Sequence, residues 1–560
     1  MQALVGQFDL AVPEALPKLQ VLLSKTPPSR TTIETQIHLA QTLVQQQNNA
    51  TLPLLETAVS ESKKLGDPRL QSYSLGLLGQ FYELQGAIDR ADRYTSEAIT
   101  LAETVGAPEI NYRWQWQMAR IFKAKGKLDP AIQSYQNALQ DIRSLRADLV
   151  SASPEAQFTF RDAVEPIHRE LVKSLLQSGT TKNLQTARDV IESLQFVELE
   201  NFFREACLTA SPDNIENVDR NAAVIYPIIL GDQLAVISSL PGEEGRPRTL
   251  KYYSTAIESG DDFNQEIVNL RDDLSQSNTA NLALPTLRKL HDLLMQPVEA
   301  DLAARKVETL VFVLDGVLRN VPMAALYDGK SYLVEKYRIA LTPGLQLLAP
   351  KPLNATKVGA LVLGLDQAQS NFSALPFVKT EVQTIQKILP TQTLYNDRFT
   401  NQNFKTTIND VSYPIVHLAT HGQFGNKADD TFILTWQGKL KISELGDTLK
   451  TGELTRSQPL ELLVLSACET AKGDGRSTLG LAGVAVRSGA RSTVATLWRV
   501  NDEASAVLMG RFYEELSKIS TTKISKAEAL RRAQLSVLRD PAYRQQPYYW
   551  APYLLIGNWT

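Results

Sequence analysis

A repeat with a period of 40 residues is the feature of this sequence that most restricts its fold. The elements that recur at this offset are Ala58, Ala98 and Ala138, and the turns Gly66-Asp67-Pro68 and Gly106-Ala107-Pro108. The apolar residues between them have a helical periodicity. A fixed period on helices predicts stacked helix pairs that bury their apolar faces against one another. We expect about three repeats, at about 31–66, 67–106 and 107–147.

The repeats belong to a helical region that we place at residues 1–210. Small residues such as Ala91 and Ala98 fall where paired helices must approach closely, and the pattern resembles the tetratricopeptide repeat, lengthened from 34 to 40 residues. Two further helices, at Pro154–Leu176 and Asn183–Ala206, are expected to cap the array. Such an array offers a concave face for a peptide or a regulatory protein.

The periodicity changes after a polar segment at 211–220, which contains Pro212 and which we interpret as a linker. In the next region, 221–410, strand-like runs alternate with helical ones, which predicts a mostly parallel sheet covered by helices. The first two runs form a hairpin around Gly231-Asp232 that extends the sheet at an edge. The strands expected here are Ala222–Leu230, Gln233–Leu240, Thr249–Ser254, Thr309–Leu314 and Val358–Leu363, and the helices are Asp262–Gln276, Leu284–Arg305 and Pro376–Ile388.

The last region, 411–560, contains three apolar runs that are typical of buried parallel strands, at Pro414–Ala419, Leu460–Ser466 and Arg491–Leu497. His421 follows the first run and Cys468 follows the second, 47 residues later. Because the carboxyl ends of parallel strands share one edge of a sheet, we expect the two side chains to meet there. An imidazole that accepts the proton of a thiol makes the sulfur nucleophilic. A histidine roughly 50 residues before the cysteine is the spacing of caspase-type thiol proteases.

Neighbouring residues are candidates for further roles. Gly422 lets the backbone approach a substrate closely, and its N–H with that of Cys468 is expected to form an oxyanion hole. Trp498, Asn501 and Asp502 follow the third strand and are candidates for the wall of a substrate pocket. Asp502 would favour a basic substrate side chain there, or it would cap a helix expected at Glu503–Leu516, which is the interpretation that we prefer.

Structural interpretations compete with each of these assignments. Cys207 is expected to be a buried structural thiol, and Cys468 and His421 taken singly also fit structural roles. Their joint placement favours the catalytic interpretation. His417 and His421 would share one face of a helix as metal ligands, but the β-branched residues before them predict a strand. We therefore expect no metal, and a buried packing role for His417.

The loop Glu469–Thr478 precedes a helix expected at Leu479–Ser488, which is the order of elements in a phosphate-binding site. The loop lacks the Gly-Lys-Ser/Thr ending that holds phosphate in such sites. We expect it to border a substrate groove instead, and we expect no cofactor.

The composition restricts the partners. Length predicts about 3 to 4 domains. The 58 basic and 61 acidic residues nearly balance, so nothing favours nucleic acid or an anionic membrane as a partner. The apolar runs are far shorter than the roughly 20 residues of a spanning helix, and no signal peptide opens the sequence. Two cysteines in 560 residues do not make a disulfide framework, which favours a reducing cytoplasm.

The motifs of residues 215–560 together resemble the CHAT domain, a caspase-related domain attached to tetratricopeptide arrays and related to separase proteases. The stretches that carry the resemblance are Asp315-Gly316-Val317-Leu318-Arg319-Asn320-Val321-Pro322, His417-Leu418-Ala419-Thr420-His421-Gly422, Leu465-Ser466-Ala467-Cys468-Glu469-Thr470, Ser488-Gly489-Ala490 and Leu497-Trp498-Arg499-Val500-Asn501-Asp502. The resemblance implies a caspase-like α/β fold in which His421 and Cys468 form a catalytic dyad. Asn501 departs from the family, in which an acidic residue is common at this position.

The prediction is therefore a helical tetratricopeptide-like solenoid followed by an α/β caspase-like domain with a mostly parallel central sheet. Its expected function is that of a cysteine endopeptidase that cleaves a protein substrate, with the repeats binding the substrate or a regulator. The alternative is a protein-interaction scaffold whose caspase-like domain is inactive.

Overall fold

A computed structural model describes residues 21–23, 25–46, 50–149, 164–203, 219–242, 247–344, 359–369, 371–410, 413–425, 430–436, 438–455, 460–470, 489–522 and 524–560. The contacts divide the chain into two compact units, Met1–Gly179 and Thr180–Thr560. The boundaries expected at 210, 220 and 410 stay predictions, and most of the linker expected at 211–220 lies outside the described residues.

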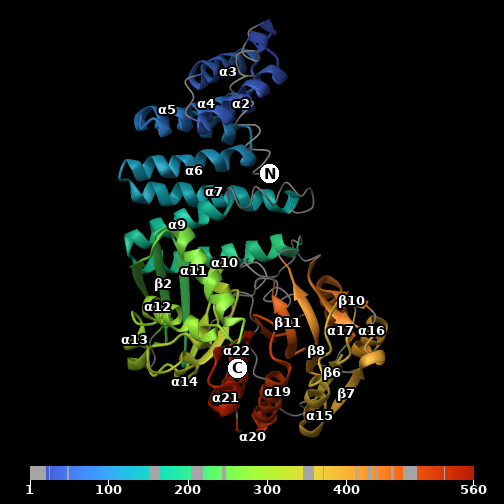
Figure 1. The fold of residues 1–560 in the computed structure, drawn as a ribbon. Coiled ribbons are helices and arrows are strands. Elements are labelled where there is room, and N and C mark those ends of the chain that lie inside the picture. Colours follow the sequence, from blue (N-terminus) through green and yellow to red (C-terminus); the bar gives the residue numbers. More distant parts are fainter. Residues whose placement is uncertain are drawn as a thin grey trace. The chain divides into compact units, whose positions relative to one another are not determined.

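The first unit is a stack of antiparallel helices (Figure 1). Each predicted repeat corresponds to one helix pair in the described part of the chain, and consecutive helices pack against each other. The helices are α2 (Arg30–Gln45), α3 (Thr51–Leu65), α4 (Pro68–Leu84), α5 (Ile88–Thr104), α6 (Pro108–Ala124), α7 (Leu128–Leu149) and α9 (Glu165–Ser178). The predicted helical repeat is confirmed.

The turn between two repeats shows why the period is fixed. Gly66 ends α3 with a φ of 70°, a left-handed conformation that glycine adopts without a steric penalty. Asp67 then caps α4, because its carboxylate accepts the backbone N–H groups of Arg69 and Leu70. Pro68 occupies the first turn of α4, where a missing N–H costs nothing. Ala91 and Ala98 of α5 are fully buried, as expected for close helix pairs.

The second unit is built on a sheet of 13 strands within the described residues. Its order is β10-β9-β8-β11-β12-β13-β5-β4-β1-β2-β3, and β6 pairs with β7 and with β8. The strands are β1 (Ala222–Ile229), β2 (Gln233–Leu240), β3 (Thr249–Ala256), β4 (Thr309–Phe312), β5 (Arg338–Leu341), β6 (Ala360–Gly364), β7 (Thr391–Tyr395), β8 (Ile415–Phe424), β9 (Phe432–Thr435), β10 (Gly438–Lys441), β11 (Leu462–Thr470), β12 (Ser492–Thr496) and β13 (Tyr553–Gly557). The predicted hairpin is β1 and β2, which with β3 forms an antiparallel edge.

The centre of the sheet is parallel, as predicted for an α/β domain. β8 pairs in parallel with β6 and with β11, and β11 pairs in parallel with β12. Helices cover the sheet (Figure 1): α10 (Thr181–Phe203), α11 (Gly260–Leu274), α12 (Leu284–Leu294), α13 (Glu299–Ala304), α14 (Leu333–Lys336), α15 (Val378–Ile388), α16 (Asn401–Asp410), α17 (Ile442–Thr455), α19 (Asp502–Leu516), α20 (Ile519–Thr522), α21 (Lys526–Arg539) and α22 (Pro547–Trp550).

Two details differ from the prediction. The single helix expected at Leu284–Arg305 is two helices, α12 and α13, because Pro297 stands between them and a proline inside a helix removes a backbone hydrogen bond. Helix α10, expected to cap the repeats, groups with the second unit, where Glu192 accepts a 2.7 Å hydrogen bond from the Tyr226 hydroxyl of β1. Of the helices that the structure describes, none combines the length and the apolar character needed to cross a bilayer.

Lys526 at the start of α21 is a buried cation and gives a stability prediction. Its side chain is fully buried, and its Nζ has no hydrogen-bond partner among the described atoms. Burial lowers its pKa from 10.5 to about 8, although the charge of Glu461 opposes this. Because the folded state binds the proton more weakly, the cost is complete below pH 8 and disappears as the pH rises towards 10.5.

We therefore expect Lys526→Met to stabilise the second unit by about 1–3 kcal/mol at pH 7 and by less at pH 10. The measurement is the free energy of unfolding in urea at both pH values, followed by hydrogen exchange of peptides from this unit. Lys289→Met is the control, because Lys289 lies in an exposed ion pair with Glu266 and its replacement changes stability by less than about 1 kcal/mol. A loss of stability on Lys526→Met at pH 7 would show that the buried charge is compensated.

Candidate active site

The two predicted catalytic residues lie on neighbouring parallel strands. In the register of β8 and β11, His421 pairs with Ala467 and Gly422 pairs with Cys468, both near the carboxyl ends of the strands. The sheet therefore fixes the backbone of Cys468 next to the backbone of the His421-Gly422 dipeptide. This placement follows from the two apolar runs in the sequence, which set the strands side by side.

A bulge in β8 separates His421 from His417. The register shifts between the pairs Leu418–Leu465 and His421–Ala467, so β8 has one residue more than β11 over this interval. A bulge of this kind re-aims the side chains that follow it. The two histidines accordingly have different surroundings and contact different residues. Among the described residues, no group of three or more His, Cys, Asp or Glu side chains is placed to hold a metal ion.

The imidazole of His421 is held by a backbone carbonyl that sequence reasoning missed. Its Nε2 lies 2.8 Å from the carbonyl oxygen of Ser373, and its ring lies 5.2 Å from the ring of Phe372. A carbonyl oxygen only accepts hydrogen bonds, so Nε2 must carry the proton. In the neutral imidazole, Nδ1 is then the nitrogen that accepts a proton. The side chain is 8% exposed, which leaves its edge accessible.

Ser373 belongs to a segment between β6 and α15 that we call the site loop, residues 371–377. Two residues that follow β12 contact this loop. Arg499 Nη2 lies 2.5 Å from Ser373 Oγ, and Asp502 Oδ2 accepts a 2.7 Å hydrogen bond from the N–H of Phe377. Burial raises the pKa of the Asp502 carboxyl, the Phe377 N–H lowers it, and the charge of Glu381 raises it further.

The three residues predicted as a pocket wall have structural contacts. Trp498 is 2% exposed, and its indole N–H donates to the carbonyl of Tyr548. Asn501 is the N-cap of α19, because its side-chain oxygen accepts the N–H of Ala504 at 2.9 Å. The capping role preferred for Asp502 is therefore wrong: Asn501 has the extended backbone of a cap, and Asp502 is the first residue of the helix. The pocket roles of all three stay predictions.

Comparison with known proteins gives the family of this part of the chain. The sequence profile of the CHAT domain matches residues 284–558. This segment is a CHAT domain.

The relatives of the whole chain contain helical repeats. Tetratricopeptide repeat protein 28 of Mus musculus is 24% identical over 336 residues, and its Homo sapiens counterpart is 23% identical over 335 residues. Each alignment covers 50% of this chain but only 13% of the relative. Among solved structures, the Saccharomyces cerevisiae separase–securin complex matches with a TM-score of 0.38 and 11% identity, over 98% of this chain and 55% of that one. A putative kinesin light chain with tetratricopeptide-like repeats from Podosopora anserina matches with a TM-score of 0.25 and 18% identity, over 35% of this chain and 90% of that one.

A buried polar cluster lies in the CHAT domain beside the strands that carry His421 and Cys468. We use this name for Glu381, His417, Ser466, Ser505 and Tyr513. Glu381 of α15 is its centre, because its Oε1 lies 2.9 Å from His417 Nε2 of β8 and accepts a 2.6 Å hydrogen bond from Ser466 of β11. His417 Nδ1 lies 3.0 Å from the hydroxyl of Tyr513 in α19. Burial and the charge of Glu381 raise the pKa of Tyr513.

The cluster confirms the buried role expected for His417, which is fully buried. Sequence reasoning missed Glu381, although a signal was present. Val378, Glu381, Val382 and Ile385 share one face of α15, at spacings of three and four residues. A carboxylate on the apolar face of a helix needs a buried partner, so its position alone predicts a polar contact inside the domain.

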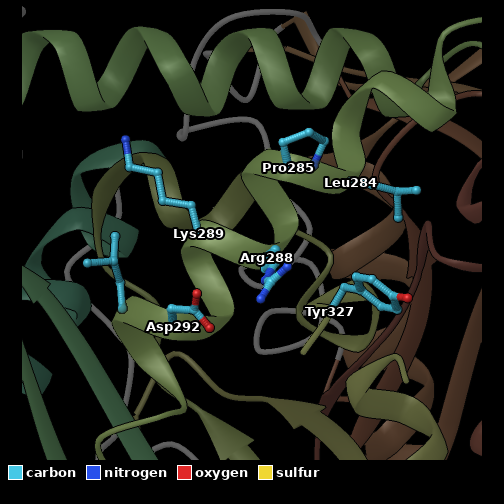
Figure 2. Close-up of a pocket in the computed structure, with 7 residues that line it drawn as sticks. Leu284, Pro285, Arg288, Lys289, Asp292 and Tyr327 are labelled. Atoms are coloured by element: carbon cyan, nitrogen blue, oxygen red, sulfur yellow. The ribbon is translucent and has the colours of Figure 1, made fainter. Parts of the chain in front are cut away.

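A cavity of about 580 Å³ lies at the start of the CHAT domain, on helix α12 (Figure 2). Its lining residues are Leu284, Pro285, Arg288, Lys289, Asp292, Leu293 and Tyr327. None of the predicted site residues lines it, and it contains neither a histidine nor a cysteine. The cavity is therefore separate from the candidate active site.

Proposed function

We propose that this protein is a cysteine endopeptidase of the caspase and separase type. The observation that supports the proposal is the contact between His421 Nε2 and the Ser373 carbonyl, 2.8 Å long, at the end of a strand whose neighbour carries Cys468. A histidine held in this way presents Nδ1 as a base, as required to activate a thiol.

In the proposed reaction, Nδ1 of His421 takes the thiol proton of Cys468, and the sulfur attacks the carbonyl carbon of the scissile peptide bond. The tetrahedral intermediate collapses when its C–N bond breaks, and His421 gives the proton to the leaving amine. Water then hydrolyses the thioester and regenerates the thiol. We assign the oxyanion hole to the N–H groups of Gly422 and Cys468, which are paired positions of β8 and β11.

The helical repeats are proposed to bind the protein substrate or a regulatory protein, since stacked helix pairs commonly present an extended binding surface. No nucleic acid or membrane partner is proposed, and the low cysteine content favours a cytoplasmic location. A second candidate function is that of a non-catalytic scaffold. It is favoured by one observation, the identity of the curated relatives as tetratricopeptide repeat proteins.

The test compares peptides released from a cell proteome by the wild type and by Cys468→Ala, with mass spectrometry of new amino termini. We expect Cys468→Ala to lower cleavage by about 10³-fold or more, because the nucleophile is lost. Cys207→Ala is the matched control and is expected to cleave like the wild type. Equal release by Cys468→Ala would exclude the peptidase, and capture of the same partners by both proteins without any cleavage would establish the scaffold.

A further inference from the structure

The site loop is held at two points by the segment that follows β12. Ser373 supplies both a carbonyl to His421 and a hydroxyl to Arg499, so the contact with Arg499 restrains the same residue that orients the histidine. Four residues later, Phe377 donates its N–H to Asp502 at 2.7 Å. The site loop therefore lies between the histidine on one side and the β12–α19 segment on the other.

We propose that Arg499 and Asp502 are positioning residues that act on His421 through the site loop. They fix the Ser373 carbonyl, which keeps the proton on Nε2 and leaves Nδ1 as the base. This inference depends on the proposed function, because it assigns a role within the same dyad. It also removes Asp502 from the recognition of a basic substrate residue, since one of its carboxylate oxygens is engaged by the Phe377 N–H.

Neither contact serves another evident purpose. Asn501 already caps α19, so the helix does not need Asp502 for its first turn. The Arg499 side chain is exposed, and an exposed arginine gains little stability from one hydroxyl contact. A pair of contacts that converge on the loop beside His421 is instead the arrangement expected for residues that orient a catalytic group.

The charged groups near His421 belong to several elements. Glu381 of α15 and His417 of β8 lie in the buried polar cluster, Asp366 precedes the site loop, and Arg499 and Asp502 follow β12. A change of one charge among them also changes the pKa of the imidazole directly. The test must therefore separate the loss of a charge from the loss of a contact, which Asp502→Asn and Glu503→Ala allow.

The experiment measures the alkylation rate of Cys468 by iodoacetamide from pH 5 to 10, by mass spectrometry of the Cys468 peptide, with Cys207 as the internal reference. No protein substrate is needed. In the wild type we expect a midpoint below the value near 8.5 of an ordinary thiol, and in His421→Ala a return to about 8.5. For Asp502→Ala and Arg499→Ala we expect midpoints between these two and rates at pH 7 that are about threefold to tenfold lower than in the wild type. Asp502→Asn keeps an acceptor for the Phe377 N–H and is expected to stay close to the wild type.

Glu503→Ala is the matched control, because Glu503 is the exposed neighbour of Asp502 and carries the same charge. It is expected to leave the midpoint unchanged. The inference is overturned if the wild type differs from His421→Ala while Asp502→Ala and Arg499→Ala behave like the wild type. It is also overturned if Asp502→Asn and Glu503→Ala shift the midpoint as much as Asp502→Ala. Identical profiles for the wild type and His421→Ala would instead exclude the proposed dyad. If Asp502→Ala does not fold, Arg499→Ala alone decides, because its side chain is exposed.

Discussion

Replacing Glu381 with alanine is expected to destabilise the second unit by about 3–5 kcal/mol, the range for removing one partner of a buried charged pair. Glu381 is 1% exposed and is shared by His417 and Ser466, which are fully or almost fully buried. Without the carboxylate, both lose the acceptor in their surroundings, and water does not reach them. The lost hydrogen bonds and the desolvated groups left behind both destabilise the folded state.

The measurement is the urea dependence of hydrogen exchange in peptides from β8 and β11, which reports the unfolding of this unit separately from the repeats. Glu381→Gln keeps the volume and one acceptor oxygen, so its effect is expected to be smaller than that of Glu381→Ala. Glu514→Ala is the matched control on α19, because Glu514 is half exposed in a pair with Arg511 and is expected to contribute less than about 1 kcal/mol. A Glu381→Ala effect as small as the control would mean that the cluster relaxes or admits water.

The strands around the candidate active site could be predicted because local signals agreed. Each of β8, β11 and β12 is a short apolar run rich in β-branched residues, and parallel strands of this kind are buried on both faces. The repeats were predictable for a similar reason, since Gly66 and Pro68 recur at Gly106 and Pro108 and mark the same turn. Patterns of this kind depend only on residues that are close in sequence.

The contacts of His421 could not be predicted in this way. Ser373 precedes His421 by 48 residues, and Arg499 follows Ser373 by 126 residues. The contact uses a backbone carbonyl, which every residue type carries, so the side chain of Ser373 gives no sign of it. Asp502 illustrates the same limit, because its position next to a helix start fits a cap, whereas its actual partner, Phe377, lies in a distant loop. Only Glu381 had a usable local signal, its place on an apolar helix face.

Gly76→Ala is expected to destabilise the repeat unit by about 2 kcal/mol, although alanine favours helices by about 1 kcal/mol over glycine. A Cβ atom at Gly76 of α4 would lie 2.2 Å from Cε2 of Trp114 in α6, far inside van der Waals contact. The indole has little freedom to retreat, because it is 3% exposed and its N–H lies 3.2 Å from Ser72 Oγ, one turn before Gly76. The added methyl group must therefore displace a helix or break this hydrogen bond.

The measurement is the urea dependence of hydrogen exchange in peptides from α4 and α6. Glu97→Ala on the exposed face of α5 is the control for a helical substitution without a clash, and it is expected to change stability by less than about 0.5 kcal/mol. A double-mutant cycle tests the cause directly. If the clash with the indole is the cause, Gly76→Ala costs less in a Trp114→Leu background than in the wild type, and the coupling energy is about 1 kcal/mol or more. An equal cost in both backgrounds would place the strain elsewhere on α4, and a stabilising Gly76→Ala would show that the helices separate readily, because alanine's helix propensity would then exceed the cost of moving them.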